Sequence, residues 1–195
     1  MRHNLFPTLV MEYENVLSDE QRLNIIDKLD LTKFTHQGAV MGGNSVSSFT
    51  VTKSIKNILD DHSSELIFEK LESKIKDYQT ITGYKTLQIL NSWINIQTPD
   101  SVLDIHSHPG SVISGALYLN VDDASSSLTF YNPNCFNTFT DFVDITEYTA
   151  PSVSFQPKNG GMLLFPSWLQ HSSGQQRNFT HKRIVLSFNT GYKLF

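Results

Sequence analysis

The chain has 195 residues, of which 39% are hydrophobic and 17% are charged, and its formal net charge is −4 at pH 7. This balance is typical of a globular protein and excludes a largely disordered chain. The sequence pI of about 5.9 argues against a broad basic surface for nucleic acid. The length predicts one domain over residues 1–195.

The cellular setting is predicted from cysteine usage and from the first residues. A single cysteine, Cys135, excludes an intrachain disulfide framework and favours a reducing compartment. Residues 1–7 lack the apolar core of a secretion signal, and no segment approaches the roughly 18 apolar residues that span a membrane. We therefore expect a soluble, cytoplasmic protein.

Residues 1–84 are predicted to form a strand and helices that pack on a sheet. Residues 6–13 predict a first strand, and Ser18 with Gln21 forms a capping box that begins a helix. That helix would place Leu23, Ile26 and Leu29 on one side. Residues 36–50 indicate a loop or two short edge strands. Apolar residues at helical spacing follow over residues 55–59 and 63–78.

The pattern changes after residue 84. Short β-rich segments alternate with turns rich in Pro, Gly, Asn and Asp; they cover residues 85–96, 113–121, 127–131, 153–156, 161–165 and 182–189. Many short strands after a helical portion predict an α+β, mostly β fold. We expect a double-stranded β-helix, or jelly roll, over residues 85–195 with the N-terminal helices as buttresses.

Three histidines form the best candidate metal site in the sequence. His106 and His108 are separated by one residue, so an extended backbone would project both rings from the same face. His171 follows a strand-like run and a Pro/Ser turn. Arg183 comes twelve residues later and begins the last apolar strand.

This order of residues resembles the Fe(II)/2-oxoglutarate-dependent oxygenase superfamily. The resemblance extends over about residues 85–195 and is strongest in HSHPGSVISGALYLN and in GGMLLFPSWLQHSS followed by RIVLSFN. These segments are similar to a subgroup of such oxygenases from marine bacteria and their phages, so the protein is expected to be bacterial or phage-encoded. One position departs from the superfamily pattern, because His108 stands where Asp or Glu is usual.

The resemblance implies a non-haem dioxygenase that uses Fe(II), 2-oxoglutarate and O2. It would hydroxylate an unidentified small molecule or protein side chain and release succinate and CO2. His106, His108 and His171 would bind the metal on one face and leave positions for the cosubstrate and O2. Asp104 is an alternative to His108 as third ligand, since it lies two residues before His106.

The resemblance also implies a cosubstrate site. Arg183 would pair with the distal carboxylate of 2-oxoglutarate through its planar guanidinium. Ser187 shares a strand face with Arg183 and would add a hydroxyl, while Tyr118 matches a Tyr that binds the cosubstrate in prolyl-hydroxylase-like members. Candidate residues of the substrate pocket are Asn91, Trp93, Asn95 and Trp168.

Two other classes of protein fit the histidines. A cupin-like three-histidine metalloprotein would not use 2-oxoglutarate, and a non-catalytic jelly-roll binding or virion module would not need the metal. Arg183 and Ser187 favour the oxygenase, because neither alternative requires them. Exposed edge strands also make a homodimer an expectation.

Overall fold

The structure is a computed structural model that describes residues 1, 3, 5–134, 141, 143–173 and 176–193. Cys135 lies outside these residues. Within the described part of the chain, no helix has both the length and the apolar character needed to cross a membrane.

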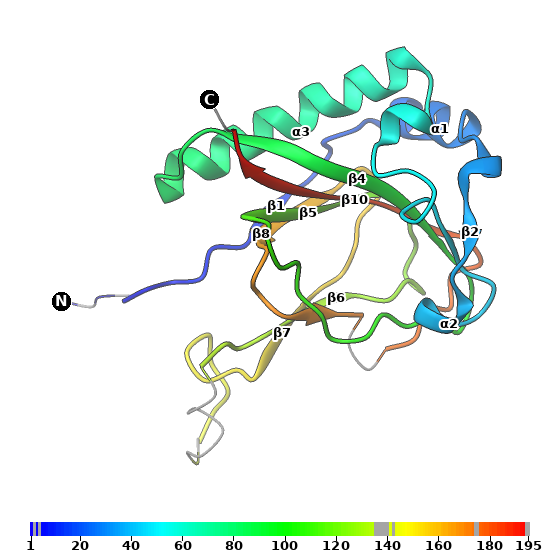
Figure 1. The fold of residues 1–195 in the computed structure, drawn as a ribbon. Coiled ribbons are helices and arrows are strands. Elements are labelled where there is room, and N and C mark those ends of the chain that lie inside the picture. Colours follow the sequence, from blue (N-terminus) through cyan, green and yellow to red (C-terminus); the bar gives the residue numbers. More distant parts are fainter. Residues whose placement is uncertain (2, 4, 135–140, 142, 174–175, 194–195) are drawn as a thin grey trace.

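Two antiparallel sheets form the molecule (Figure 1). The larger has seven strands in the order β1-β8-β5-β10-β4-β3-β2, and the smaller has three in the order β7-β6-β9. The strands are β1 (Met11–Tyr13), β2 (Thr35–His36), β3 (Val46–Ser47), β4 (Leu87–Gln97), β5 (Ile113–Asn120), β6 (Leu128–Tyr131), β7 (Ser152–Phe155), β8 (Met162–Pro166), β9 (His171–Ser172) and β10 (Arg183–Tyr192). This arrangement is the predicted jelly roll.

The helical segments all precede β4 in the chain. They are α1 (Asp19–Asp27), η1 (Leu31–Lys33), α2 (Gly38–Met41), η2 (Ile55–Asn57) and α3 (Asp61–Thr82). Asp60 caps the long helix α3 by accepting a hydrogen bond from the Ser63 amide at 2.9 Å, and Gly83 ends it in the left-handed conformation. Figure 1 shows α3 lying along the outer face of the large sheet.

Two apolar clusters hold these layers together. The first joins α3 to the outer face of the large sheet through Ile67, Leu71 and Ile75. The second lies between the two sheets, and its buried members are Ala116, Tyr118, Val121, Leu128, Phe130, Leu163, Phe165, Leu169 and Val185. The helices therefore stabilise one face of the sheet, while the other face encloses the interior of the roll.

Strand β10 runs between β4 and β5 and contributes to both clusters. Ile184, Leu186 and Phe188 belong to the cluster under α3. Arg183 and Ser187 line a cavity on the opposite face of the sheet. This is the alternation expected of a strand, and it gives the cavity a floor that is continuous with the core.

The N-terminal elements differ in detail from their predictions. The first strand is only Met11–Tyr13, because Pro7 lacks a backbone donor and Phe6 has a positive φ of 56°. In α1 the predicted cap at Ser18 is confirmed. Of the predicted apolar face, Ile26 and Leu29 pack against the core, whereas Leu23 is exposed. The buried residues of the helix are Arg22 and Ile25. Arg22 reaches the Leu119 carbonyl at 2.8 Å and sets the rotation of the helix.

Candidate metal centre and adjoining cavity

Backbone hydrogen bonds position the three histidines before any ligand is considered. The His106 amide donates to the His171 carbonyl and the His171 amide donates to the His106 carbonyl, both at 3.0 Å. The His108 amide donates to the Ser167 carbonyl at 2.8 Å. His171 lies on β9, which pairs with β6, whereas His106 and His108 lie in the segment before β5 rather than in a regular strand. These hydrogen bonds thus hold the segment before β5 against β9 and the turn that precedes it.

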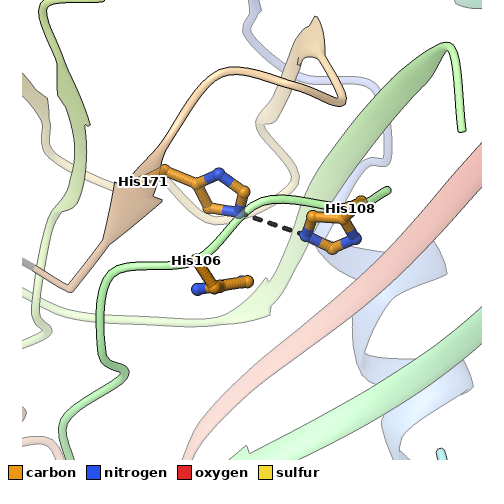
Figure 2. Close-up of side chains that lie close together, drawn as sticks. All are labelled: His106, His108 and His171. Atoms are coloured by element: carbon orange, nitrogen blue, oxygen red, sulfur yellow. Dashed lines mark hydrogen bonds between the residues drawn. The ribbon is translucent and has the colours of Figure 1, made fainter. Parts of the chain in front are cut away.

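The three imidazoles converge on one small volume (Figure 2). His108 Nε2 lies 3.2 Å from His171 Nε2, and one ligand atom from each of the three rings falls within 4.8 Å of the others. Two nitrogens bound about 2.1 Å from one metal at a right angle are separated by about 3.0 Å. The His108–His171 distance therefore matches a pair of adjacent ligands, with His106 next to them.

Backbone carbonyls fix the tautomers of two rings. His106 Nδ1 lies 2.8 Å from the Asp104 carbonyl oxygen, and His171 Nδ1 lies 2.8 Å from that of Leu169. A carbonyl only accepts, so each Nδ1 carries the hydrogen and each Nε2 keeps its lone pair. The Asp104 carboxylate is exposed and is not part of the histidine group. Asp104 instead contributes its backbone carbonyl, which orients the His106 ring.

Two of the three rings, His108 and His171, are neutral at physiological pH. Burial, followed by the nearby His106, lowers the pKa of His108 to about 4. The same two causes lower the pKa of His171 to about 3. Phe165 packs edge-on against the His171 ring, with a centroid separation of 4.7 Å. Neutral imidazole is the form that binds metals, so the donor set fits a divalent transition metal.

A cavity of about 250 Å³ extends from the histidines along β10, β4 and β5. Its deep end contains the buried side chains of Arg183 and Tyr118. Arg183 Nη1 donates to Gln97 Oε1, but Nε has no hydrogen-bond partner, and neither has the Tyr118 hydroxyl. The guanidinium carbon lies 5.5 Å from the centroid of the Tyr118 ring.

Arg183 is a buried cation without an acidic partner among the described residues. An unpaired buried charge is unfavourable, so this geometry fits an anionic ligand. Burial lowers the pKa of Arg183, and it raises the pKa of Tyr118 to about 12. The Tyr118 hydroxyl is therefore protonated and available to donate. The cavity combines a metal-binding end with an anion-binding end.

The family model described as "Putative 2OG-Fe(II) oxygenase" matches residues 91–189. The chain belongs to this family. The matched segment spans β4 to β10 and contains the three histidines and Arg183. This protein is therefore an Fe(II)- and 2-oxoglutarate-dependent oxygenase, an oxidoreductase that uses O2 and a prime substrate. Comparison with curated proteins found no match.

Solved structures of other oxygenases share the fold. HygX from Streptomyces hygroscopicus, with nickel and 2-oxoglutarate bound, is 14% identical with a TM-score of 0.62, over 96% of this chain and 84% of that one. A prolyl-4-hydroxylase from Pseudomonas putida is 8% identical with a TM-score of 0.65, over 96% and 94%. The viral collagen prolyl hydroxylase of Paramecium Bursaria Chlorella virus-1 is 13% identical with a TM-score of 0.61, over 94% and 96%. At these identities the likeness establishes the jelly-roll fold.

The oxygenase brings together most of the residues selected from its sequence. The cavity lining includes His106, His108, His171, Arg183, Ser187, Tyr118, Trp93 and Asn95. It does not include Asn91 or Trp168. Asn91 accepts a hydrogen bond from Asn189 at 3.0 Å, and Trp168 is 53% exposed in the turn before β9.

Sequence reasoning missed one residue of the deep end, the Arg183 partner Gln97. The alternation that selected Trp93 and Asn95 on β4 continues to Gln97, so the same face predicts it. What the sequence did not predict was the pairing register of β4 and β10, which places Gln97 directly opposite Arg183.

Proposed function

We propose that this oxygenase binds Fe(II) through His106, His108 and His171. The proposal is supported by three imidazole rings whose ligand atoms gather within 4.8 Å and by the carbonyl contacts that turn two Nε2 atoms toward the shared space. When bound, iron and 2-oxoglutarate supply the oxidative chemistry that converts a C–H group of the prime substrate to an alcohol, with succinate and CO2 as co-products. The protein positions these groups and excludes water.

Arg183, Tyr118 and Ser187 are proposed to hold 2-oxoglutarate. Arg183 would pair with the distal carboxylate, because its buried guanidinium has an unpaired Nε and, among the described residues, donates to the neutral side chain of Gln97 and to no acid. The Tyr118 hydroxyl, also without a partner, would donate to the same carboxylate. Ser187 lies four residues along β10 from Arg183, on the same face of the strand, and is paired with Trp93 of β4. Its hydroxyl would donate a further hydrogen bond to the bound dianion.

The all-histidine donor set has an electrostatic consequence for cosubstrate binding. Three neutral imidazoles leave the full charge of a divalent metal in the cavity, whereas a carboxylate ligand would cancel part of it. The His108 side chain occupies the position usually given to that carboxylate. The proposed centre therefore attracts a dianion more strongly than the usual donor set, and Arg183 adds a second attraction at the far end.

The observation that carries this proposal is the presence, in one cavity, of the convergent histidines and the unpaired buried arginine. The test is an anaerobic titration of the Fe(II)-loaded protein with 2-oxoglutarate, followed by the weak visible charge-transfer band of the chelate. We expect the band in the wild type, a much weaker band at equal 2-oxoglutarate in Arg183→Ala, and none in His108→Ala.

Two results would contradict the assignment. An unchanged band in Arg183→Ala would remove Arg183 from the cosubstrate site. An unchanged band in His108→Ala would leave His106 and His171 with a different third ligand, and Asp104→Ala would then be the next variant to measure. Asp104→Ala is otherwise a matched control, because its carboxylate is exposed outside the histidine group.

The organisation and setting of the protein are also proposals. Contacts between α3 and the sheet strands within one apolar cluster support a single domain, which would unfold in one transition. The single cysteine supports a cytoplasmic setting. The exposed edge strand β7 supports a homodimer. The molar mass of the protein in solution tests this. The expected bacterial or phage origin and the absence of nucleic-acid binding remain predictions.

A further inference from the structure

The cavity contains very few charged groups. Its lining includes no Asp, Glu or Lys among the described residues, and Arg183 is the one lining residue with a permanent charge. Once Arg183 has paired with 2-oxoglutarate, no charged side chain of the lining is left for a prime substrate.

One wall of the cavity is apolar. It is formed by Val40 and Met41 of α2, by Phe49 from the segment between β3 and η2, and by Trp93 of β4. The Phe49 and Trp93 rings meet edge to face at 5.0 Å, and the Trp93 ring lies 6.0 Å from that of His108. Val40 is 61% exposed and Phe49 is 41% exposed, so the wall continues to the surface. Exposed apolar groups at the mouth of a pocket mark a binding surface.

Two amides provide the polar groups of this wall. Asn95 Oδ1 accepts from Ser47 Oγ at 2.6 Å, which leaves the Asn95 NH2 group without an acceptor among the described residues. Gln37 Nε2 donates to Thr35 Oγ1 at 3.1 Å, which leaves the side-chain oxygen Oε1 of Gln37 without a donor among the described residues. The mouth therefore offers an uncharged donor and an uncharged acceptor beside the aromatic pair.

We propose that the prime substrate inserts an uncharged group with an apolar or aromatic face, packed on Phe49 and Trp93 and hydrogen-bonded to Asn95. A zwitterion or a phosphate would lose its hydration here without gaining a charged partner, and an ammonium would gain only the faces of the two aromatic rings. Lys53 does not alter this argument, because its Nζ lies 6.0 Å from the Phe49 ring centroid but outside the cavity lining. The inference rests on the proposed function, which assigns Arg183 to 2-oxoglutarate.

The size of the cavity limits how much of the substrate enters. Its volume of about 250 Å³ is below the roughly 300–1,000 Å³ usual for ligand pockets, and 2-oxoglutarate takes part of it. Only a small group therefore reaches the histidines, while the rest of the substrate lies across Val40 and Phe49. A neutral carboxamide that carries one aromatic or branched apolar group has this size and polarity.

Trp168→Phe gives a direct reporter of binding. The chain has two tryptophans, so this variant leaves Trp93 as the sole indole, and Trp168 itself does not line the cavity. The variant is loaded with Ni(II) and 2-oxoglutarate without turnover. It is then titrated with N-acetylphenylalanine amide, N-acetylphenylalanine and phenylalanine amide, which are neutral, anionic and cationic versions of one aromatic body.

We expect the neutral probe to change Trp93 fluorescence with an affinity at least roughly tenfold above both charged probes. Phe49→Ala should weaken the neutral probe about fivefold. Asn95→Asp should reverse the order in favour of the cationic probe, because a carboxylate would then face the cavity. Equal or tighter binding of a charged probe to the unaltered cavity, or no neutral binding at about 10 mM, would overturn the inference.

Calorimetric titration of the same samples with 2-oxoglutarate separates the two proposals. If 2-oxoglutarate binds in an Arg183-dependent manner and the order of the probes is wrong, the substrate inference alone fails. If 2-oxoglutarate does not bind, the proposed assignment of the cosubstrate site fails as well. Retained 2-oxoglutarate binding in Phe49→Ala and Asn95→Asp also shows that these variants are folded.

Discussion

The two faces of β10 differ in what they contribute. Toward α3 the strand places Ile184, Leu186 and Phe188 in a fully apolar cluster. Toward the cavity it places Arg183 and Ser187, and the buried Nε of Arg183 has no partner. The first face supplies stability through burial, whereas the second leaves polar groups unsatisfied until ligands arrive. One strand thus separates stability from function by the alternation of its side chains.

Removal of a large side chain from the apolar face tests its role most strongly. Phe188 is fully buried under α3, so Phe188→Ala should lower the free energy of unfolding by about 3–5 kcal/mol. Chemical denaturation measures this loss. The affinity of the folded protein for 2-oxoglutarate should change less than about threefold, which is under 1 kcal/mol. A loss of stability below about 1 kcal/mol would mean that this face does not support the fold.

The opposite result is expected from Arg183→Met on the cavity face. The change should leave stability equal or higher, because it removes an unpaired buried charge, while 2-oxoglutarate affinity falls about a hundredfold. Arg22→Met is a matched control, since both arginines are 7% exposed but Arg22 contacts Asp19 and the Leu119 carbonyl. The control should lose about 1–2 kcal/mol of stability and keep its affinity. Calorimetry and denaturation of both proteins distinguish the two roles.

A smaller change at the same site tests whether the charge of Arg183 must stay unpaired. Gln97→Glu preserves length but places a carboxylate against the guanidinium, so 2-oxoglutarate affinity should fall about twentyfold. Asn91→Asp adds the same charge on β4 outside the cavity lining and should have little effect. An unchanged affinity in Gln97→Glu, measured by calorimetry, would show that Gln97 does not control the anion site.

Low pH should destabilise the metal-free protein, because His108 and His171 at the cavity must become protonated. The pKa values of His108 and His171 are lowered in the folded state to about 4 and about 3, from an ordinary value of 6.5. Between these limits the unfolded chain binds more protons, so stability falls as the pH decreases below about 6.5. Each histidine contributes at most about 1.4 kcal/mol per pH unit. Chemical denaturation at several pH values below 6.5 should show a weaker dependence of the unfolding free energy on pH in His108→Asn than in the wild type. Equal pH dependence would contradict a lowered pKa of His108 in the folded state.

The sequence predicted the features that depend on local pattern. Alternation identified the strands from β4 to β10 except β9, which is only His171–Ser172 and is defined by its pairing with β6. The spacing of the histidines predicted that they form one group. The role of Arg183 came from the resemblance to the oxygenase superfamily, in which these residues follow the same order. Strand alternation grouped Trp93 and Asn95 on one face, and both line the cavity; their contact with a substrate stays a prediction.

Other features depend on long-range contacts that no local pattern contains. The buried face of α1 is set by the bond from Arg22 to the Leu119 carbonyl, across 97 residues. The importance of Gln97 comes from its pairing with Arg183 across two strands. Trp168 was placed near the cavity by its proximity to His171 in the chain, but the turn before β9 directs it to the surface. In each case tertiary geometry, rather than composition, decides the outcome.

The reciprocal hydrogen bonds between His106 and His171 have an entropic consequence. They close the loop between these residues, and the bond from His108 to the Ser167 carbonyl closes it at a second point. The conformational entropy of these segments is therefore lost during folding, and it is not lost again when an ion binds. Only the reorientation of side chains and the release of water remain for the binding step. For the proposed ligands, metal would then bind to a framework that is already assembled.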